Sequence, residues 1–273
     1  MLEGYTPLNV SQGLEINRPS LYRNPSPKNS ERKEDDPEAL ERIRAVRRQF
    51  PFLGYQKLRV IIKRQGKAIN HKRLYRLMQK EGLLLPRRHN PPFEASGRFE
   101  LPEVKNRLWQ IDSTKVWVEE HGWAHVFAIL DVFDRYLVGW SAGLRGRGKD
   151  ALACLERAVL REFPYGVRDQ GLVLMSDHGS CFTGSVFHGA LNILGIGRRL
   201  CRRRTPRHNA FVESFFAQLK REEVWPNEYK TVEEALEGIG RYVEEYNYLR
   251  PHGKIAMLTP AEKRGKILYK IAA

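Results

Sequence analysis

The sequence has few cysteines and no long apolar run. Its three cysteines, Cys154, Cys181 and Cys201, are too few and too far apart for a disulfide framework, and none forms a Cys-x-x-Cys pair that would suggest structural zinc. No stretch approaches the roughly 18 apolar residues that a membrane-spanning helix requires, and no signal peptide is visible at the start. These absences predict a cytoplasmic protein with reduced thiols and no membrane partner.

Positive charge is abundant and unevenly distributed. The 273 residues include 47 Lys and Arg against 32 Asp and Glu, a net charge of +15, and the 41% of hydrophobic residues suffice for a folded core. Residues 41–90 alone hold 15 Lys and Arg against two acids, a net of +13 in fifty residues. Because such a segment attracts polyanions, nucleic acid is the expected partner.

Composition divides the chain into four segments. Residues 1–36, rich in Pro, Ser and Asn, are expected to form an N-terminal tether, and residues 86–104, interrupted by Pro and Gly, a linker. Residues 37–85 show three short helical patterns, with Asn70 as the N-cap of the third. This predicts a small all-α, helix-turn-helix-like DNA-binding domain whose last helix presents Lys72, Arg73 and Arg76 to DNA. The alternative is an ordinary helical hairpin with a solvated basic face.

From residue 105 to residue 273 the pattern changes to α/β. Three consecutive strands are predicted at 108–117, 123–132 and 136–142. A helix at 149–163, a strand at 171–176, a helix at 184–194 and a strand at 196–201 follow, and helices at 209–224 and 231–249 close the domain. A meander followed by alternating helices and strands predicts a mixed five-stranded sheet with flanking helices, in the order of the ribonuclease H-like fold.

Three acids stand out by their positions. Asp112 lies inside the first strand, Asp177 follows the fourth, and Glu213 begins a helix. Each has an ordinary alternative. Asp177 can be a turn residue, Glu213 an acid that stabilises a helix dipole, and Asp112 a buried acid paired with another residue. Converging carboxylates, however, are the ligands that hard divalent cations prefer, and two such ions can activate a nucleophile and stabilise a leaving group at a phosphodiester. The three acids are therefore candidate metal ligands and catalytic residues.

Several motifs occur together in one order. The sequence resembles the catalytic subunit, the second-reading-frame product, of bacterial insertion-sequence transposases with a retroviral-integrase-like core. The resemblance rests on residues 109–114 (WQIDST), 130–135 (LDVFDR), 138–140 (VGW), 176–180 (SDHGS), 209–216 (NAFVESFF), 246–252 (YNYLRPH) and 258–260 (LTP), and upstream on 54–55 (GY) and 70–78 (NHKRLYRLM). Two positions depart from the family pattern, Cys181 where Gln is common and His208 where Asp is common.

The resemblance implies an enzyme, a divalent-metal-dependent DNA strand transferase of the DDE type. In such enzymes the trio matching Asp112, Asp177 and Glu213 binds the metal, as two Mg²⁺ or Mn²⁺ ions, and water or a 3′ hydroxyl attacks a DNA phosphate in line. The implied partners are double-stranded DNA, as element ends and target, a second copy of the chain, and in some members an upstream-frame DNA-binding subunit. The implied location is the nucleoid.

Further basic residues are candidate DNA contacts near these acids. Arginines cluster just before the Glu213 helix, among them Arg202, Arg203 and Arg204, and Lys220 follows Glu213 by nearly two helical turns on the same face. A solvated charge run is the alternative for the arginines. Loop positions on the protein surface are the favoured interpretation of His178 and His208, and Cys181 lacks a base partner that would make it a nucleophile.

Two other functions remain open at this point. One is a ribonuclease H-fold nuclease that cuts DNA without joining it, and the other is a non-catalytic DNA-binding regulator. Strand joining would separate the transposase from the nuclease, and an active acid trio would exclude the regulator.

Overall fold

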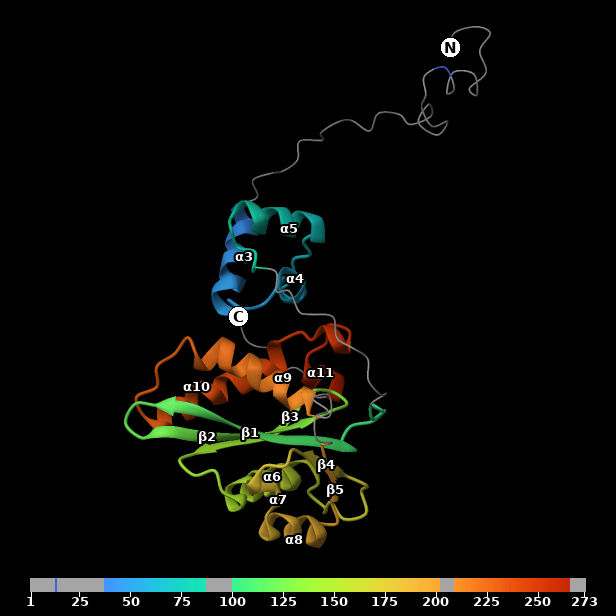
Figure 1. Cartoon of the computed structure of the whole chain (residues 1–273). Helices are drawn as coiled ribbons and strands as arrows, with labels where there is room; N and C mark the ends of the chain where they lie inside the picture. Colours follow the sequence, from blue (N-terminus) through green and yellow to red (C-terminus); the bar gives the residue numbers. More distant parts are fainter. Residues whose placement is uncertain (1–12, 14–36, 87–99, 202–208, 266–273) are drawn as a thin grey trace. The chain divides into compact units, whose positions relative to one another are not determined.

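The computed structural model describes residue 13 and residues 37–86, 100–201 and 209–265 (Figure 1). By its internal contacts the chain divides into two units, residues 1–42 and 43–273, and this division falls inside the first helix described below. The expected tether at 1–36 and most of the linker lie outside the described residues, as do Arg202, Arg203, Arg204 and His208.

Three helices occupy the basic segment, as predicted. They are α3 (Pro37–Gln49), α4 (Tyr55–Arg64) and α5 (His71–Lys80). Asn70 caps α5, because its side chain accepts a hydrogen bond from the Lys72 N–H at 2.9 Å. On α5 the apolar stripe at helical spacing is buried, namely Leu74, Leu77 and Met78.

A mixed five-stranded sheet forms the centre of the larger domain and confirms the predicted fold class. Its strands are β1 (Leu108–Val118), β2 (Gly122–Asp131), β3 (Leu137–Gly143), β4 (Val173–Ser176) and β5 (Gly197–Leu200). The strand order is β3-β2-β1-β4-β5. The first three strands pair antiparallel as a meander, whereas β4 and β5 run parallel to β1. β1 therefore lies in the middle of the sheet, between the two halves of the topology.

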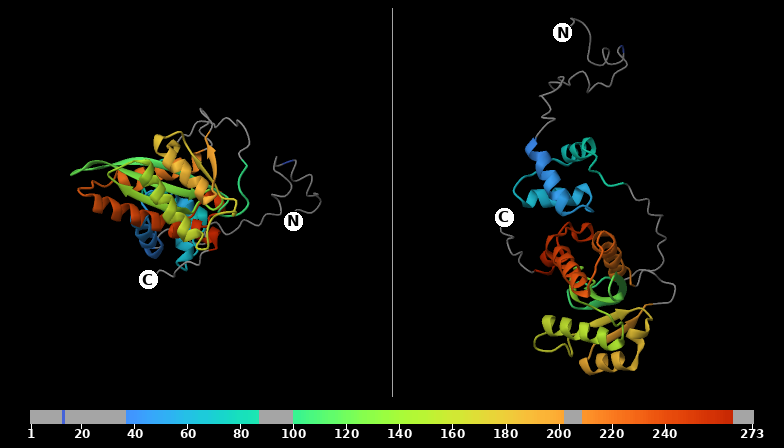
Figure 2. Two further views of the ribbon diagram at one scale, coloured as in Figure 1. Left: turned by 90° about the horizontal axis from the view of Figure 1, so that it is seen from below. Right: turned by 90° about the vertical axis from the view of Figure 1, so that its left-hand side faces the viewer.

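Helices cover both faces of this sheet (Figures 1 and 2). One face carries α6 (Gly148–Glu162), α7 (Ser180–Thr183) and α8 (Ser185–Leu194), and the other carries α9 (Ala210–Leu219) and α10 (Val232–Glu244). Strand alternation supplies the two cores: Ile111 of β1 packs toward α6, whereas Val116 and Val118 pack toward α9 and α10.

The last two predicted helices are shorter than expected, because each changes from α to π geometry near its end. The stretch predicted at 209–224 ends in the π-helix η2 (Lys220–Val224), and the stretch predicted at 231–249 ends in the π-helix η3 (Glu245–Leu249). In η3 the buried Asn247 amide pairs with both the N–H and the C=O of Leu137, at 2.9 and 3.2 Å, which holds this turn against β3. Side-chain periodicity does not distinguish these last turns from α-helix.

A buried ion cluster attaches the end of the described chain to the sheet. The short helices η4 (Gly253–Ile255) and α11 (Pro260–Arg264) follow η3 and were not predicted. Arg264 is completely buried and donates to Asp131 at 3.0 Å, to Asp134 at 2.6 Å and to Glu162 at 2.7 Å. Asp131 also accepts the Asn106 N–H, so this acid joins the end of β2 to two other segments.

Candidate active site

Asp112 lies in β1 just beyond the point where β1 and β4 stop pairing. The last paired residues are Gln110 and Met175, and two positions further along each strand stand Asp112 and Asp177. Both strands end their pairing at their carboxyl sides, where ligands bind in open α/β sheets. Beyond this point β1 continues to Val118, whereas β4 ends at Ser176.

Hydrogen bonds orient both aspartates. One oxygen of Asp112 accepts the Ser113 N–H at 2.7 Å and the other accepts the Asn209 amide at 3.1 Å. Asp177 accepts the Gly179 N–H at 2.9 Å, and a Cβ at Gly179 would lie only 2.9 Å from the same carboxylate oxygen. A side chain at this position would therefore push the Asp177 carboxylate aside.

Glu213 completes the group from the first turn of α9. Burial raises its pKa, and the charge of Asp177 adds to the rise. Burial also raises the pKa of Asp112 to about 7, and the charges of Asp177 and Glu213 add to that effect. The fold thus brings together three acids that are far apart in the sequence, close enough for the charge of Asp177 to raise the pKa of both Asp112 and Glu213.

The donor set fits a hard divalent cation by its chemistry. Three neighbouring carboxylates, one of them with a pKa raised by burial and like charge, form a site whose electrostatic cost a cation relieves. Within the part of the chain that the structure describes, no group of three or more His, Cys, Asp or Glu side chains is close enough to hold a metal.

Two amide residues at this site were not predicted. Gln110 is completely buried and its side-chain oxygen accepts the Val212 N–H of α9 at 3.2 Å. Asn209, which precedes α9 and is only 4% exposed, donates to Asp112. A polar residue two positions before Asp112 in an apolar strand was the signal that could have identified Gln110, since residues i and i+2 share a strand face.

The neighbouring thiols are poor nucleophiles. Burial raises the pKa of Cys201 to about 11, and burial also raises the pKa of Cys181; the charge of Asp177 adds to both effects. These thiols are therefore protonated at neutral pH, in line with the expectation for Cys181. His178 is exposed, and its Nε2 lies 2.9 Å from the Cys201 carbonyl oxygen, which supports the surface-loop interpretation.

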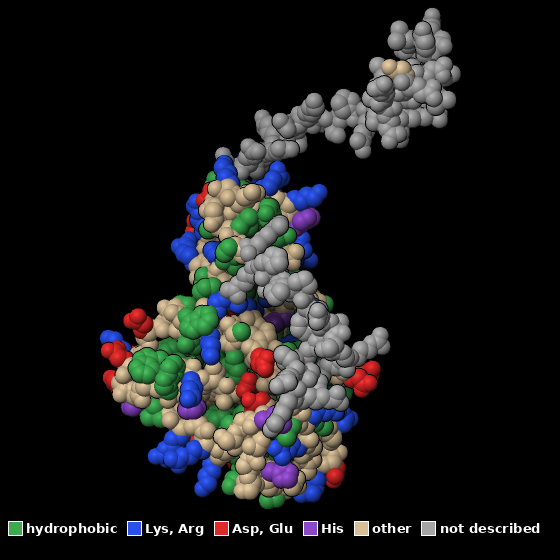
Figure 3. Space-filling model, viewed as in Figure 1, with side chains coloured by type: hydrophobic (Ala, Val, Ile, Leu, Met, Phe, Trp, Pro, Cys, Tyr) green, Lys and Arg blue, Asp and Glu red, His purple; other side chains and the backbone are tan. Residues whose placement is uncertain are grey.

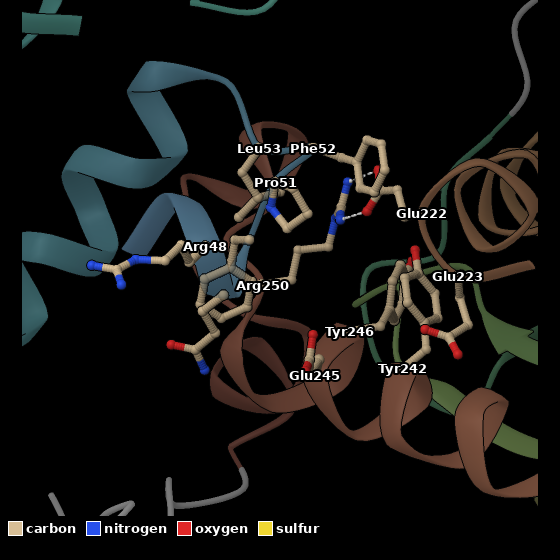
Figure 4. Close-up of a pocket in the computed structure, with 12 residues that line it drawn as sticks. Arg48, Pro51, Phe52, Leu53, Glu222, Glu223, Tyr242, Glu245, Tyr246 and Arg250 are labelled. Carbon is tan, nitrogen blue, oxygen red and sulfur yellow. Dashed lines mark hydrogen bonds and ion pairs between the residues drawn. The ribbon is translucent and has the colours of Figure 1, made fainter. Parts of the chain in front are cut away.

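The motif at 246–252 contributes packing beside the core helices. Arg250 and Glu222 form a buried double hydrogen-bonded ion pair, drawn with dashed lines in Figure 4. Tyr246 is buried and packs edge-on against His252, with ring centroids 4.7 Å apart. The pocket in Figure 4 is lined by residues 48–53, by residues of η2, α10 and η3 and by Arg250, and by none of the three acids. These contacts support a packing role for this motif.

The basic residues expected to contact DNA are only partly described. Lys72 and Arg76 are exposed on α5 and Arg73 is half-buried there, and Figure 3 shows Lys and Arg side chains gathered around α3, α4 and α5. Lys220, the first residue of η2, lies near enough to Asp112 for its charge to lower the pKa of that acid. Its predicted place beside the acids is consistent with this effect.

Comparison with known families gives the same architecture. Two models described as integrase core domain match residues 102–206 and 194–260, and a model described as an HTH-like domain matches residues 33–91. The chain belongs to the integrase core family. The two core models together span β1 to α11 and include the three acids.

Insertion-sequence transposases are among the relatives of this integrase-core chain. It is 29% identical to the transposase for insertion sequence element IS904 of Lactococcus lactis, over 89% of this chain and 98% of that one. It is 27% identical to transposase InsD for insertion element IS2A/D/F/H/I/K of Escherichia coli, over 84% of this chain and 78% of that one. The resemblance predicted from the motifs is confirmed.

A solved structure shares the fold. A chain from the cryo-electron microscopy structure of a simian T-cell lymphotropic virus intasome aligns with a TM-score of 0.52 and 16% identity, over 85% of this chain and 76% of that one. The described part of the chain contains no helix long and apolar enough to cross a membrane.

Proposed function

We propose that this integrase-core chain is a transposase that cuts the ends of a mobile DNA element and joins them to target DNA, with Asp112, Asp177 and Glu213 as its metal-binding catalytic residues. The observation that carries the proposal is the proximity of these acids where β1 and β4 stop pairing, with burial and like charge raising the pKa of Asp112 to about 7. The similarity to a transposase over 89% of this chain supports the same activity.

The reaction is a pair of phosphoryl transfers. In the first, water attacks a DNA phosphorus in line, one P–O bond forms, and the P–O3′ bond breaks to leave a free 3′ hydroxyl. In the second, that hydroxyl attacks a target phosphate and one P–O bond again replaces another. Because each step exchanges one P–O bond for another, joining requires no added energy source and no covalent protein intermediate.

The acids have a defined role in this chemistry. Asp112 lies within β1, Asp177 directly follows β4 and Glu213 lies in the first turn of α9, so three separate elements supply the oxygen ligands. They would hold Mg²⁺ or Mn²⁺, as two ions, and bound ions supply activation of the attacking oxygen and charge stabilisation of the leaving oxygen. Carboxylates suit this role because hard cations prefer oxygen ligands.

In this proposal, basic residues from two parts of the chain hold the DNA. Lys72, Arg73 and Arg76 on α5 contact the duplex from the helix-turn-helix-like domain, while Lys220 and the arginines at 202–204 contact phosphates near the acids. Since joining requires two element ends, at least two copies of the chain act together. The proposal also includes a subunit, encoded in an upstream reading frame, that recognises the element ends. It places the action of the chain at the nucleoid.

The decisive experiment is nicking and joining of supercoiled plasmid by the purified full chain with Mn²⁺ or Mg²⁺, beside Glu213→Gln. The matched control is Glu237→Gln, which neutralises an exposed acid on α10. Metal-dependent products that vanish in Glu213→Gln and persist in Glu237→Gln are expected. Cleaved products without joined ones would favour a nuclease, and DNA binding without any metal-dependent product in the wild-type chain would favour a regulator.

The role of Lys220 has its own test. Lys220→Ala is expected to weaken binding to a short duplex carrying an element end, with Lys230→Ala, an exposed lysine before α10, as the control. Equal affinities of the two variants would remove Lys220 from the DNA-binding surface.

A further inference from the structure

Two buried amide side chains bridge β1 and the start of α9 in opposite directions. Gln110, on the strand, accepts the Val212 N–H of the helix at 3.2 Å. Asn209, at the head of the helix, donates to the Asp112 carboxylate of the strand at 3.1 Å. The strand thus holds the helix backbone, and the helix holds the strand's acid.

The burial of these amides calls for a specific role. Gln110 is 0% exposed between Trp109 and Ile111, both of which are also fully buried. An amide at such a position costs free energy unless it is hydrogen-bonded, and an apolar residue would serve the core better. Its side-chain oxygen accepts a first-turn N–H of α9, a group that has no partner within the helix itself.

The Asn209 contact restricts the orientation of Asp112. One oxygen of Asp112 is held by the Ser113 N–H and the other by the Asn209 amide, so the plane of the carboxylate is set from both sides. The buried Oδ1 of Asn209 has no hydrogen-bond partner among the described residues. This oxygen is therefore available as an acceptor at the site that Asp112 faces.

We infer that Gln110 and Asn209 are positioning residues which set the separation and orientation of Asp112 and Glu213 for metal binding. The inference rests on the proposed function, because it assigns these amides a purpose only if the acids hold a cation. Gln110 and Asp112 share one face of β1, and Val212 immediately precedes Glu213, so the two bonds link the two acids through a short, rigid path. Residues that orient ligands in this way contribute to metal affinity.

The first test measures Mn²⁺ binding by electron paramagnetic resonance in the full chain. Asn209→Leu keeps the side-chain size and removes the donor to Asp112, and Asn192→Leu, an exposed amide on α8, is the control. Asn209→Leu is expected to weaken Mn²⁺ binding about tenfold or more, the loss typical of residues that orient metal ligands. Unchanged Mn²⁺ affinity in a folded Asn209→Leu protein would overturn the role of Asn209.

The second test requires no metal. Gln110→Met removes the acceptor for the Val212 N–H, whereas Gln110→Glu keeps an acceptor oxygen. The control is Gln218→Met, which changes an amide on α9 that bonds to Ser214. Hydrogen–deuterium exchange over residues 209–216 is expected to accelerate in Gln110→Met and to stay slow in the other two variants. Equal exchange in all three variants would overturn the role of Gln110. If Asn209→Leu does not fold, this exchange measurement alone tests the inference.

Asp112→Asn separates this inference from the proposed function. If Asp112→Asn abolishes Mn²⁺ binding while Asn209→Leu leaves it unchanged, the acids bind metal and the positioning role alone is wrong. If Mn²⁺ binds wild type and Asp112→Asn equally, the proposed metal site itself is wrong.

Discussion

Replacement of Arg264 by Met tests how the buried ion cluster supports the catalytic domain. Arg264 is fully buried and donates to three carboxylates, Asp131, Asp134 and Glu162. Met matches the length of the apolar stem and removes the guanidinium, so three acids at the junction of α11, β2 and α6 lose their shared cation. Removal of one partner from a buried ion pair costs about 3–5 kcal/mol, and we expect a loss of that size at pH 8.

The loss should depend on pH in a definite direction. Burial, followed by the charge of Asp131, raises the pKa of Asp134 to about 6, while Arg264 lowers it. A raised carboxyl pKa means that the folded state binds the proton more tightly than the unfolded state, so Asp134 opposes folding above pH 6 and less so as pH falls toward 4. Without Arg264 this opposition grows at high pH, because the carboxylates remain charged, and protonation relieves it at low pH.

The assay is urea unfolding followed by far-ultraviolet circular dichroism at pH 8 and pH 5. Arg157→Met, which removes an exposed arginine from α6, is the control. The difference in unfolding free energy between wild type and Arg264→Met should shrink from pH 8 to pH 5, and Asp134→Asn should restore part of it at pH 8. A loss below about 1 kcal/mol at pH 8, or an equal loss at both pH values, would refute this account of the cluster.

Three further predictions concern packing and capping. The Arg135 guanidinium lies 3.6 Å from the centre of the Phe211 ring, so a double-mutant cycle of Arg135→Ala and Phe211→Leu in unfolding should show coupling of about 1 kcal/mol; additive effects contradict it. Thr259 accepts the N–H of Glu262 in a capping box, so Thr259→Ala should cost about 1 kcal/mol in urea unfolding, and Thr259→Ser much less. A Cβ at Gly139 would lie 2.7 Å from the Ala158 Cβ, so Gly139→Ala should lower stability by about 1–3 kcal/mol; failure of Ala158→Gly to rescue it would show that the clash lies elsewhere.

Much of the fold could be predicted from local patterns. The apolar runs of β1 and β2 and the helical spacing of apolar residues in α6 indicate which segments are buried, and this pattern depends mainly on nearby residues. Asn70 and its helix boundary were predictable for the same reason, since a cap satisfies backbone groups within three residues. The π-helical ends η2 and η3 were not, because their geometry depends on partners such as Leu137 that are distant in sequence.

The candidate site, like the fold, could be predicted from the sequence only in part. Asp112, Asp177 and Glu213 were identifiable from residue type, order and resemblance, because metal-dependent phosphoryl transfer demands carboxylates and leaves few alternatives at those positions. The sequence could not show that Asp112 carries a pKa of about 7, since that value depends on burial and on charges contributed by two remote segments. It likewise gave no indication of the contact from Asn209 to Asp112.

The sequence by itself determined which elements form and which chemistry the chain can carry, since local periodicity and side-chain type decide both. Only the tertiary structure decided that Gln110 reaches the N–H of Val212 and that Arg264 meets three acids, because each contact joins residues more than 100 positions apart. Such contacts depend on how strands and helices pack, and packing is a property of the whole domain rather than of any one segment.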